Sequence, residues 1–185
     1  MMILLCSVAM STLQNPQIKV IMMNREAVIE LLKQQNVSHE VIDHPAAYTI
    51  ADMESFGLPR IDQIAKNLFI RDDKKRNYYL LTIQKDKSVN LKQLRTLLES
   101  RPLTFASEED LMQLLGLTKG AVSPFGILND KERTVKFVLD EDLQKGKTIG
   151  VHPNENTATV WLAPEDLLNI VTAHGNEISV ITLQA

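Results

Sequence analysis

Apolar residues recur along the chain with two spacings, one typical of helices and one typical of strands. Apolar positions three and four residues apart predict amphipathic helices, which cover residues 24–35, 49–56, 91–98, 108–115 and 164–173. Short runs rich in branched and aromatic residues predict strands, which cover residues 39–43, 67–71, 78–83, 135–139, 148–151, 157–162 and 178–183. About seven strands interleaved with about five short helices predict an α/β fold of the α+β type, with a mixed sheet rather than a parallel doubly wound one.

Two segments between these elements have distinct compositions. Residues 72–77, Asp-Asp-Lys-Lys-Arg-Asn, separate two predicted strands, so we expect a hairpin whose charged tip faces water. Residues 116–126 contain three Gly and one Pro. This composition predicts a loop rather than a helix or a strand.

Length and cysteine content restrict the class of protein. A chain of 185 residues, with 44% hydrophobic and 23% charged residues, has the size and composition of one globular domain. Cys6 is the only cysteine, and the four histidines have no zinc-ligand spacing. The Gly-rich dinucleotide fingerprint and the phosphate-binding loop are both missing from the sequence. We therefore expect no disulfide, no metal and no cofactor.

The first residues of the chain differ from the rest. Residues 1–10 are apolar, but no Lys or Arg precedes them and the run is too short to span a bilayer. The helical pattern begins at Asn24, which can cap a helix. We expect residues 1–22 to be an appendage, disordered or translated from an upstream start codon. Residues 23–185 are expected to form the working domain, in the cytoplasm and without membrane contact.

Charge is distributed unevenly along the chain. The net charge is −3, yet residues 60–101 carry 11 Lys or Arg against 5 Asp or Glu, and the remainder carries 9 against 18. Such asymmetry indicates that the middle of the chain meets a polyanion. The alternative is a solvated surface on which charges of one sign happen to cluster.

Lys66 and His152 are candidate functional side chains. A lysine at the rim of a core, as in Ile-Ala-Lys66-Asn-Leu, can hold a phosphate or carboxylate while its stem packs on apolar neighbours. It can equally be a surface lysine at the start of a strand. A histidine between two predicted strands can bond a substrate oxygen or move a proton, or its imidazole can only tie down the loop.

The backbone of residues 120–124, Gly-Ala-Val-Ser-Pro, is a third candidate. Glycine lets a backbone approach a ligand, and exposed N–H groups can bind a carbonyl or a developing oxyanion. The alternative is an ordinary connection to the next strand. Ser123 has no demonstrable base partner, so covalent catalysis is disfavoured.

Four short segments together resemble the YbaK/prolyl-tRNA-synthetase-associated editing family and, within it, the free-standing ProX-type deacylases. They are His44-Pro45 with Thr49, the run Ala65-Lys66-Asn67-Leu68-Phe69, the Gly-x-x-x-Pro loop of residues 120–126, and His152-Pro153 with Asn156 and Thr157. They follow the family's order, and the similarity covers about residues 23–185. The resemblance implies a single-domain editing fold with a curved, mixed and largely antiparallel sheet.

The resemblance also implies an activity. It is the hydrolysis, in trans, of the carboxylic ester between a wrong amino acid and the terminal adenosine of tRNA, with Ala-tRNA(Pro) as the expected substrate and prolyl-tRNA synthetase as a candidate partner. The family assigns the catalytic set, which is Lys66, Asn67, Gly120 and His152. The substrate-binding set expected around it is Tyr48, Thr49, Ile50, Ser123, Pro124, Phe125, Gly126 and Asn156. Ala47 and Leu58 are further candidates for the amino-acid pocket.

In this family the attacking water is generally helped by the neighbouring ribose hydroxyl of the substrate, which agrees with the lack of a nucleophile–base pair in the sequence. Two alternatives stay open at this point. The chain could bind tRNA or an aminoacyl group without catalysis, as a sensor or synthetase partner. It could also remove cysteine or another amino acid instead of alanine. The oligomeric state is not readable from the sequence.

Overall fold

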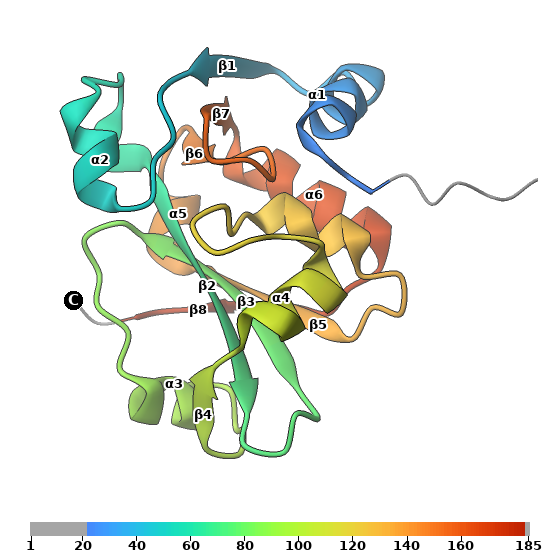
Figure 1. Ribbon diagram of the computed structural model, residues 1–185. Helices are drawn as coiled ribbons and strands as arrows, with labels where there is room; N and C mark the ends of the chain where they lie inside the picture. The colour runs from blue at the N-terminus through green and yellow to red at the C-terminus, as the bar shows by residue number, and fades with distance from the viewer. Residues whose placement is uncertain (1–21, 184–185) are drawn as a thin grey trace, which may run out of the picture.

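Two β-sheets and a set of short helices make up the computed structural model, which describes residues 22–183 (Figure 1). The helices are α1 (Arg25–Gln34), α2 (Ile50–Ser55), α3 (Leu91–Leu97), α4 (Glu108–Leu115), α5 (Glu141–Gln144), α6 (Pro164–His174) and the 3-10 helices η1 (Ile61–Gln63) and η2 (Pro124–Asn129). The strands are β1 (His39–Asp43), β2 (Ala65–Asp72), β3 (Tyr78–Gln84), β4 (Leu103–Phe105), β5 (Val135–Asp140), β6 (Ile149–Val151), β7 (Ala158–Leu162) and β8 (Ile178–Ile181).

The larger sheet has five strands in the order β4-β2-β3-β5-β8. Strands β2, β3 and β4 pair antiparallel, whereas β5 pairs parallel with both β3 and β8. The smaller sheet is antiparallel, with the order β1-β7-β6. A single parallel bridge between Ile64 and Gly150 joins the two sheets at one point. Strand β4 pairs with β2 only from Ile70 onward, so the first half of β2 has no strand partner on the side opposite β3, and this stretch is called the free edge of β2.

Side-chain caps explain where the helices begin. The Asn24 side chain accepts a hydrogen bond from the Ala27 N–H at 3.0 Å. Thr49 and Ser107 each form a capping box with the aspartate three residues later, which satisfies N–H groups that the first turn leaves unpaired. Hydrogen bonds from these capping side chains therefore set the first residues of α1, α2 and α4.

The main hydrophobic core lies between the larger sheet and helices α1, α4 and α6, and includes Phe69, Phe125 and Phe137. A smaller cluster surrounds Trp161 beneath α2. Gly150 permits this packing, because a Cβ there would lie 2.6 Å from the indole ring. The Trp161 ring thus packs against the short strand β6, which ends at Val151, one residue before His152.

The structure confirms the mixed α/β fold, the short helices and the hairpin of β2 and β3. The expected single sheet is divided in two. Three local predictions were wrong: β4 and α5 were missed, and η2 occupies the end of the segment predicted to be a loop. Pro124 occupies the first turn of η2, and the Ser123 hydroxyl accepts the Phe125 N–H at 3.2 Å, so proline and serine begin a helix here instead of preventing one.

The predicted appendage, residues 1–22, lies outside the described residues except for Met22, and so does Cys6. Within residues 22–183, no helix has the length and apolar character needed to cross a membrane.

Candidate active site

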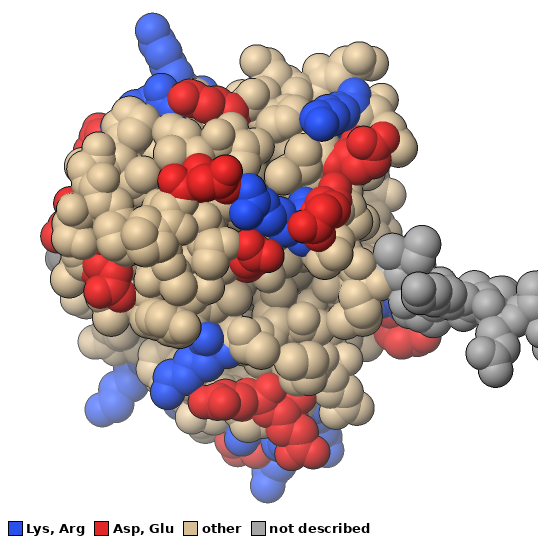
Figure 2. Space-filling model, turned by 45° about the horizontal axis from the view of Figure 1, so that its top comes forward, with Lys and Arg blue, Asp and Glu red and all other residues tan. Residues whose placement is uncertain are grey.

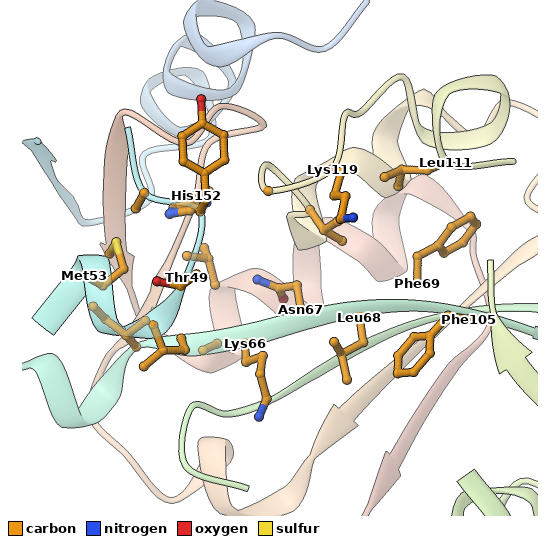
Figure 3. A pocket seen from close by; sticks show the side chains of 18 of the residues that line it. Thr49, Met53, Lys66, Asn67, Leu68, Phe69, Phe105, Leu111, Lys119 and His152 are labelled. Atoms are coloured by element: carbon orange, nitrogen blue, oxygen red, sulfur yellow. The ribbon is translucent and has the colours of Figure 1, made fainter. Parts of the chain in front are cut away.

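A cavity of about 650 Å³ lies along the free edge of β2. It is bounded at one end by the bridge between Ile64 and Gly150, and at the other by the pairing of Ile70 with Phe105. Figure 3 shows Met53 near the first end and Phe105 at the opposite end. Most lining side chains are apolar, with a few polar groups among them, which is the usual composition of a small-molecule site.

Asn67 is the polar side chain that β2 presents to this cavity. Its Oδ1 accepts a hydrogen bond from the Thr82 hydroxyl on β3, with an oxygen–oxygen distance of 2.7 Å. Figure 3 shows its amide nitrogen turned into the cavity, on the side of His152. Asn67 therefore offers N–H donors to a ligand.

Lys66 also lines the cavity, but its ammonium group does not face His152. The Nζ donates a hydrogen bond to the backbone carbonyl of Lys87, on the opposite side of β2 from Asn67 (Figure 3). Burial lowers the pKa of Lys66, and nearby Asp86 partly offsets that effect. Lys66 and His152 were both expected in the catalytic set, but the amine and the imidazole do not face each other, because neighbouring residues of a strand point to opposite faces and Asn67 takes the face toward His152.

His152 lines the cavity opposite β2. Burial, and secondarily the neighbouring His44, lower its pKa to about 4, so the imidazole is neutral near pH 7. Among the described residues its ring has no hydrogen-bond partner, so the ring does not tie down the loop. Its backbone carbonyl does that instead, by accepting the Ser123 hydroxyl.

The His44 ring lies next to the His152 ring. The two ring centroids are 5.9 Å apart, and the His44 ring also stacks on Phe56, with a centroid distance of 5.5 Å. The His44 Nδ1–H donates to the Pro45 carbonyl at 2.8 Å, and Nε2 shares a hydrogen bond with the Thr159 hydroxyl at 3.0 Å. These bonds hold the His44 ring beside His152.

Gly120 lies at the mouth of the cavity with φ of +88°, a conformation that favours glycine. A Cβ there would lie 2.9 Å from the ring of Tyr48, which is 70% exposed. Within the described chain, the N–H groups of Gly120 and Val122 have no acceptor, whereas that of Ala121 donates to Thr118 at 3.0 Å. The loop thus contributes two residues with unpaired N–H groups to the cavity lining, and the Tyr48 ring lies beside the first of them.

Part of the predicted substrate-binding set lies elsewhere. Tyr48, Thr49 and Ile50 line the cavity, as does Ala47. Residues 123–126 are buried and do not line it, and Leu58 packs in the Trp161 cluster. Asn156 also lies behind the lining, where its amide donates to the Ala47 carbonyl at 3.1 Å. The cavity lining therefore does not include six of the residues predicted to bind the substrate, which are Ser123, Pro124, Phe125, Gly126, Asn156 and Leu58.

The far end of the cavity was missed by the sequence analysis. Phe69, Phe105 and Leu111 form it, with Lys119 and Glu108 at its rim. The Lys119 and Glu108 side chains approach to 3.8 Å, and both are well exposed. Phe69 ends the run of residues 65–69, whereas the other four come from elements that only the sheet pairing brings close to it, so no local motif marks them. Among residues 22–183 no group of three or more His, Cys, Asp or Glu is arranged to hold a metal ion.

Residues 44–170 match the model of the aminoacyl-tRNA editing domain. The chain belongs to this family. The prolyl-tRNA editing protein ProX of Acetoanaerobium sticklandii is 45% identical over 159 residues, which cover 86% of this chain and 97% of the relative. The prolyl-tRNA synthetase associated domain-containing protein 1 of Mus musculus is 37% identical over 146 residues, or 75% of this chain and 83% of the relative.

A solved structure, proposed to be a trans-editing enzyme for prolyl-tRNA synthetase, shares the fold of this editing domain. Its TM-score is 0.66 at 22% sequence identity, and the match covers 86% of this chain and 97% of that one. Because it belongs to the aminoacyl-tRNA editing family, this editing domain is a hydrolase of aminoacyl-tRNA ester bonds and tRNA is its substrate.

Ion pairs neutralise much of the basic stretch of this editing domain. Of its 11 cationic residues, six pair with carboxylates. The six are Arg60, Arg71, Lys75, Lys85, Lys87 and Arg101. Figure 2 shows Lys or Arg beside Asp or Glu over one face of the molecule. The charge asymmetry of the sequence is therefore largely cancelled in space.

Proposed function

We propose that this editing domain removes alanine from mischarged tRNA(Pro) in trans. The observation that carries the proposal is the cavity on the free edge of β2, where Asn67, His152 and the loop at Gly120 present polar groups within apolar walls. The 45% identity to a relative named prolyl-tRNA editing protein ProX supports tRNA(Pro) as the tRNA. The relative from Mus musculus, which is named a prolyl-tRNA synthetase associated domain-containing protein, supports a functional link to prolyl-tRNA synthetase.

The chemistry requires little more than positioning. An aminoacyl ester is already activated, so holding the ester, its neighbouring ribose hydroxyl and a water together provides much of the rate enhancement. The water oxygen bonds to the ester carbonyl carbon, the carbon–oxygen bond to the ribose breaks, and the ribose oxygen receives a proton. The free amino acid and the 3′ end of the tRNA are the products.

Three groups of the cavity suit this reaction. The amide of Asn67 and the free N–H groups of Gly120 and Val122 supply donors for the carbonyl oxygen as it gains negative charge. The neutral His152 bonds a substrate oxygen and places the ribose. The ribose hydroxyl neighbouring the ester assists the water, since the described lining contains no serine–histidine or cysteine–histidine pair.

The size of the amino-acid side chain can explain why alanine is removed and proline is kept. A synthetase built for proline cannot strongly reject the smaller alanine, so a second pocket that admits alanine and excludes proline completes a double sieve. Ala47, Ile50 and Met53 supply one apolar wall of the cavity. This wall is the candidate pocket for the amino-acid side chain.

A deacylation panel tests the proposal. Purified protein is incubated with Ala-, Cys-, Ser- and Pro-tRNA(Pro), and release of each labelled amino acid is followed, with Asn67→Ala as the matched variant of reduced activity. We expect fastest loss of alanine and retention of the proline ester. Preferred hydrolysis of the cysteine ester would reassign the amino acid, and tight binding without hydrolysis at high protein concentration would overturn the enzyme mechanism.

A further inference from the structure

We propose that Thr82 is a positioning residue of the editing site: its buried hydroxyl fixes the Asn67 amide so that the cavity always meets the NH2 group and never the amide oxygen. This inference rests on the proposed function, because it defines what Asn67 offers to the aminoacyl ester.

The two residues face each other across the hairpin. Asn67 of β2 and Thr82 of β3 are direct partners in the antiparallel register. The Thr82 hydroxyl lies 2.7 Å from Asn67 Oδ1 and is completely buried, whereas Asn67 is half-buried and lines the cavity. Thr82 is thus inside the core, whereas Asn67 reaches the cavity.

The direction of this hydrogen bond determines the amide orientation. Among the described residues, the Thr82 hydroxyl has no hydrogen-bond partner besides Asn67. Thr82 lies opposite Leu139 on its other side and follows Leu80 and Leu81 in the same strand, so its surroundings are apolar. A buried hydroxyl needs an acceptor for its hydrogen, and the amide oxygen provides one. A flipped amide would present its own N–H groups to Thr82 and leave that hydrogen unpaired.

The orientation decides which substrate group can bind. With Oδ1 engaged, the part of Asn67 that reaches the cavity is a donor, so its partner must be an acceptor, the ester carbonyl or a ribose oxygen. The α-ammonium of the aminoacyl group carries only donors and is excluded from this position. Thr82 thereby selects the direction in which the ester enters the site.

A double-mutant cycle tests the inference. The variants are Thr82→Val, which keeps shape and removes the hydroxyl, Thr82→Ser, which keeps the hydroxyl, Asn67→Ala, and Asn67→Ala combined with Thr82→Val. We expect Thr82→Val to lower kcat/KM about 10-fold, roughly the effect of one hydrogen bond, and Thr82→Ser to recover most of that loss. In the Asn67→Ala background, Thr82→Val is expected to change kcat/KM less than about twofold, because coupled residues are not additive.

Thr134→Val is the control for loss of a threonine hydroxyl away from the cavity, where the hydroxyl donates to Asp130 at 3.2 Å. Thermal unfolding of every variant verifies that the fold is kept. Full activity of Thr82→Val, or the same loss with and without Asn67, would overturn the inference.

A binding measurement separates this inference from the proposed function. Wild type and Thr82→Val, both labelled with 15N, are titrated with 3′-(L-alanylamino)-3′-deoxyadenosine, whose amide cannot be cleaved as an ester. We expect the Asn67 side-chain NH2 signals, assigned by their loss in Asn67→Ala, to shift in the wild type and to shift much less in Thr82→Val. An inactive wild type with this pattern would reject the editing reaction and keep the role of Thr82. Equal shifts in both proteins would reject the role of Thr82 whatever the activity.

Discussion

The ammonium group of Lys66 donates to the backbone carbonyl of Lys87, on the opposite side of β2 from Asn67. The Lys87 side chain is in turn held by Asp140 at 2.9 Å, Asp142 at 2.6 Å and the Leu183 carbonyl at 2.9 Å. The buried Lys87 side chain therefore holds its loop in place, and the backbone carbonyl of the same residue accepts the hydrogen bond from Lys66. Lys66 can contact a substrate phosphate or carboxylate only after its flexible stem rotates away from this carbonyl.

Lys66→Ala is expected to lower kcat/KM by about 10- to 100-fold, mostly through KM, because an anchoring charge strengthens substrate binding more than the chemical step. Steady-state deacylation gives the two parameters, and circular dichroism checks the fold. Near-normal turnover with unchanged KM would remove Lys66 from the site and leave its bond to Lys87 as a structural contact.

Lys87→Met is expected to destabilise the protein by about 3 kcal/mol, because it leaves Asp140 buried without its ion-pair partner. Urea unfolding measures the free energy of unfolding. Lys145→Met is the matched control, since Lys145 pairs with the same Asp142 at an exposed position, and it is expected to leave the unfolding midpoint almost unchanged. Equal midpoints for the two variants would show that the buried ion pair does not stabilise the fold.

His152 is expected to titrate with a midpoint near 4, because burial, and then His44, lower its pKa. An unfolded histidine titrates near 6.5, so the unfolded chain binds more protons between these values. The contribution of His152 to stability is therefore complete above about pH 6.5 and is lost as the pH falls toward 4. Two-dimensional NMR of the imidazole signals measures the midpoint, and His152→Asn is expected to lose less stability than wild type between pH 7 and 5. A midpoint above 6 would contradict the buried, neutral ring.

Gly120→Ala is expected to reduce deacylation more than stability. The new Cβ would lie 2.9 Å from the exposed Tyr48 ring, which can shift, while a positive φ costs an alanine on the order of 1 kcal/mol. Displacement of the ring and of the two free N–H groups is expected to lower kcat about 10-fold or more. Gly57→Ala is the control, since Gly57 also has a positive φ but nothing lies near its Cβ position. Equal loss of activity in both variants would attribute the effect to strain alone.

The salt dependence of tRNA binding is expected to come from the cations of the basic stretch that lack ion pairs. Within the described residues, Lys74 and Arg76 at the hairpin tip form no ion pair, and the tip adjoins β4, which ends at Phe105 in the cavity wall. Replacing both with alanine is expected to weaken tRNA binding and to lower the slope of log K against log salt by about 2. Arg101→Ala, which breaks the pair with Asp73, is expected to change the slope less. An unchanged slope in the double variant would place the tRNA on another face.

The sequence determined the local structure of this protein, because helix caps, turn residues and apolar spacing act over a few positions. Asn24, Thr49 and Ser107 begin helices where their side chains reach nearby N–H groups, and the motifs around Asn67, Gly120 and His152 identified three walls of one cavity. Strand alternation could also have shown that Lys66 and Asn67 point to opposite faces.

Tertiary structure alone decided the rest, since it depends on pairing between distant segments. The free edge of β2 exists because β6 meets it only at the bridge between Ile64 and Gly150 and β4 pairs with it only from Ile70 onward. Carboxylates far away in sequence cancel much of the basic stretch, and a buried threonine on the neighbouring strand orients the amide that faces the ligand. None of these contacts leaves a periodic or local signal, because each depends on which side chains the folded sheets bring within a few ångströms.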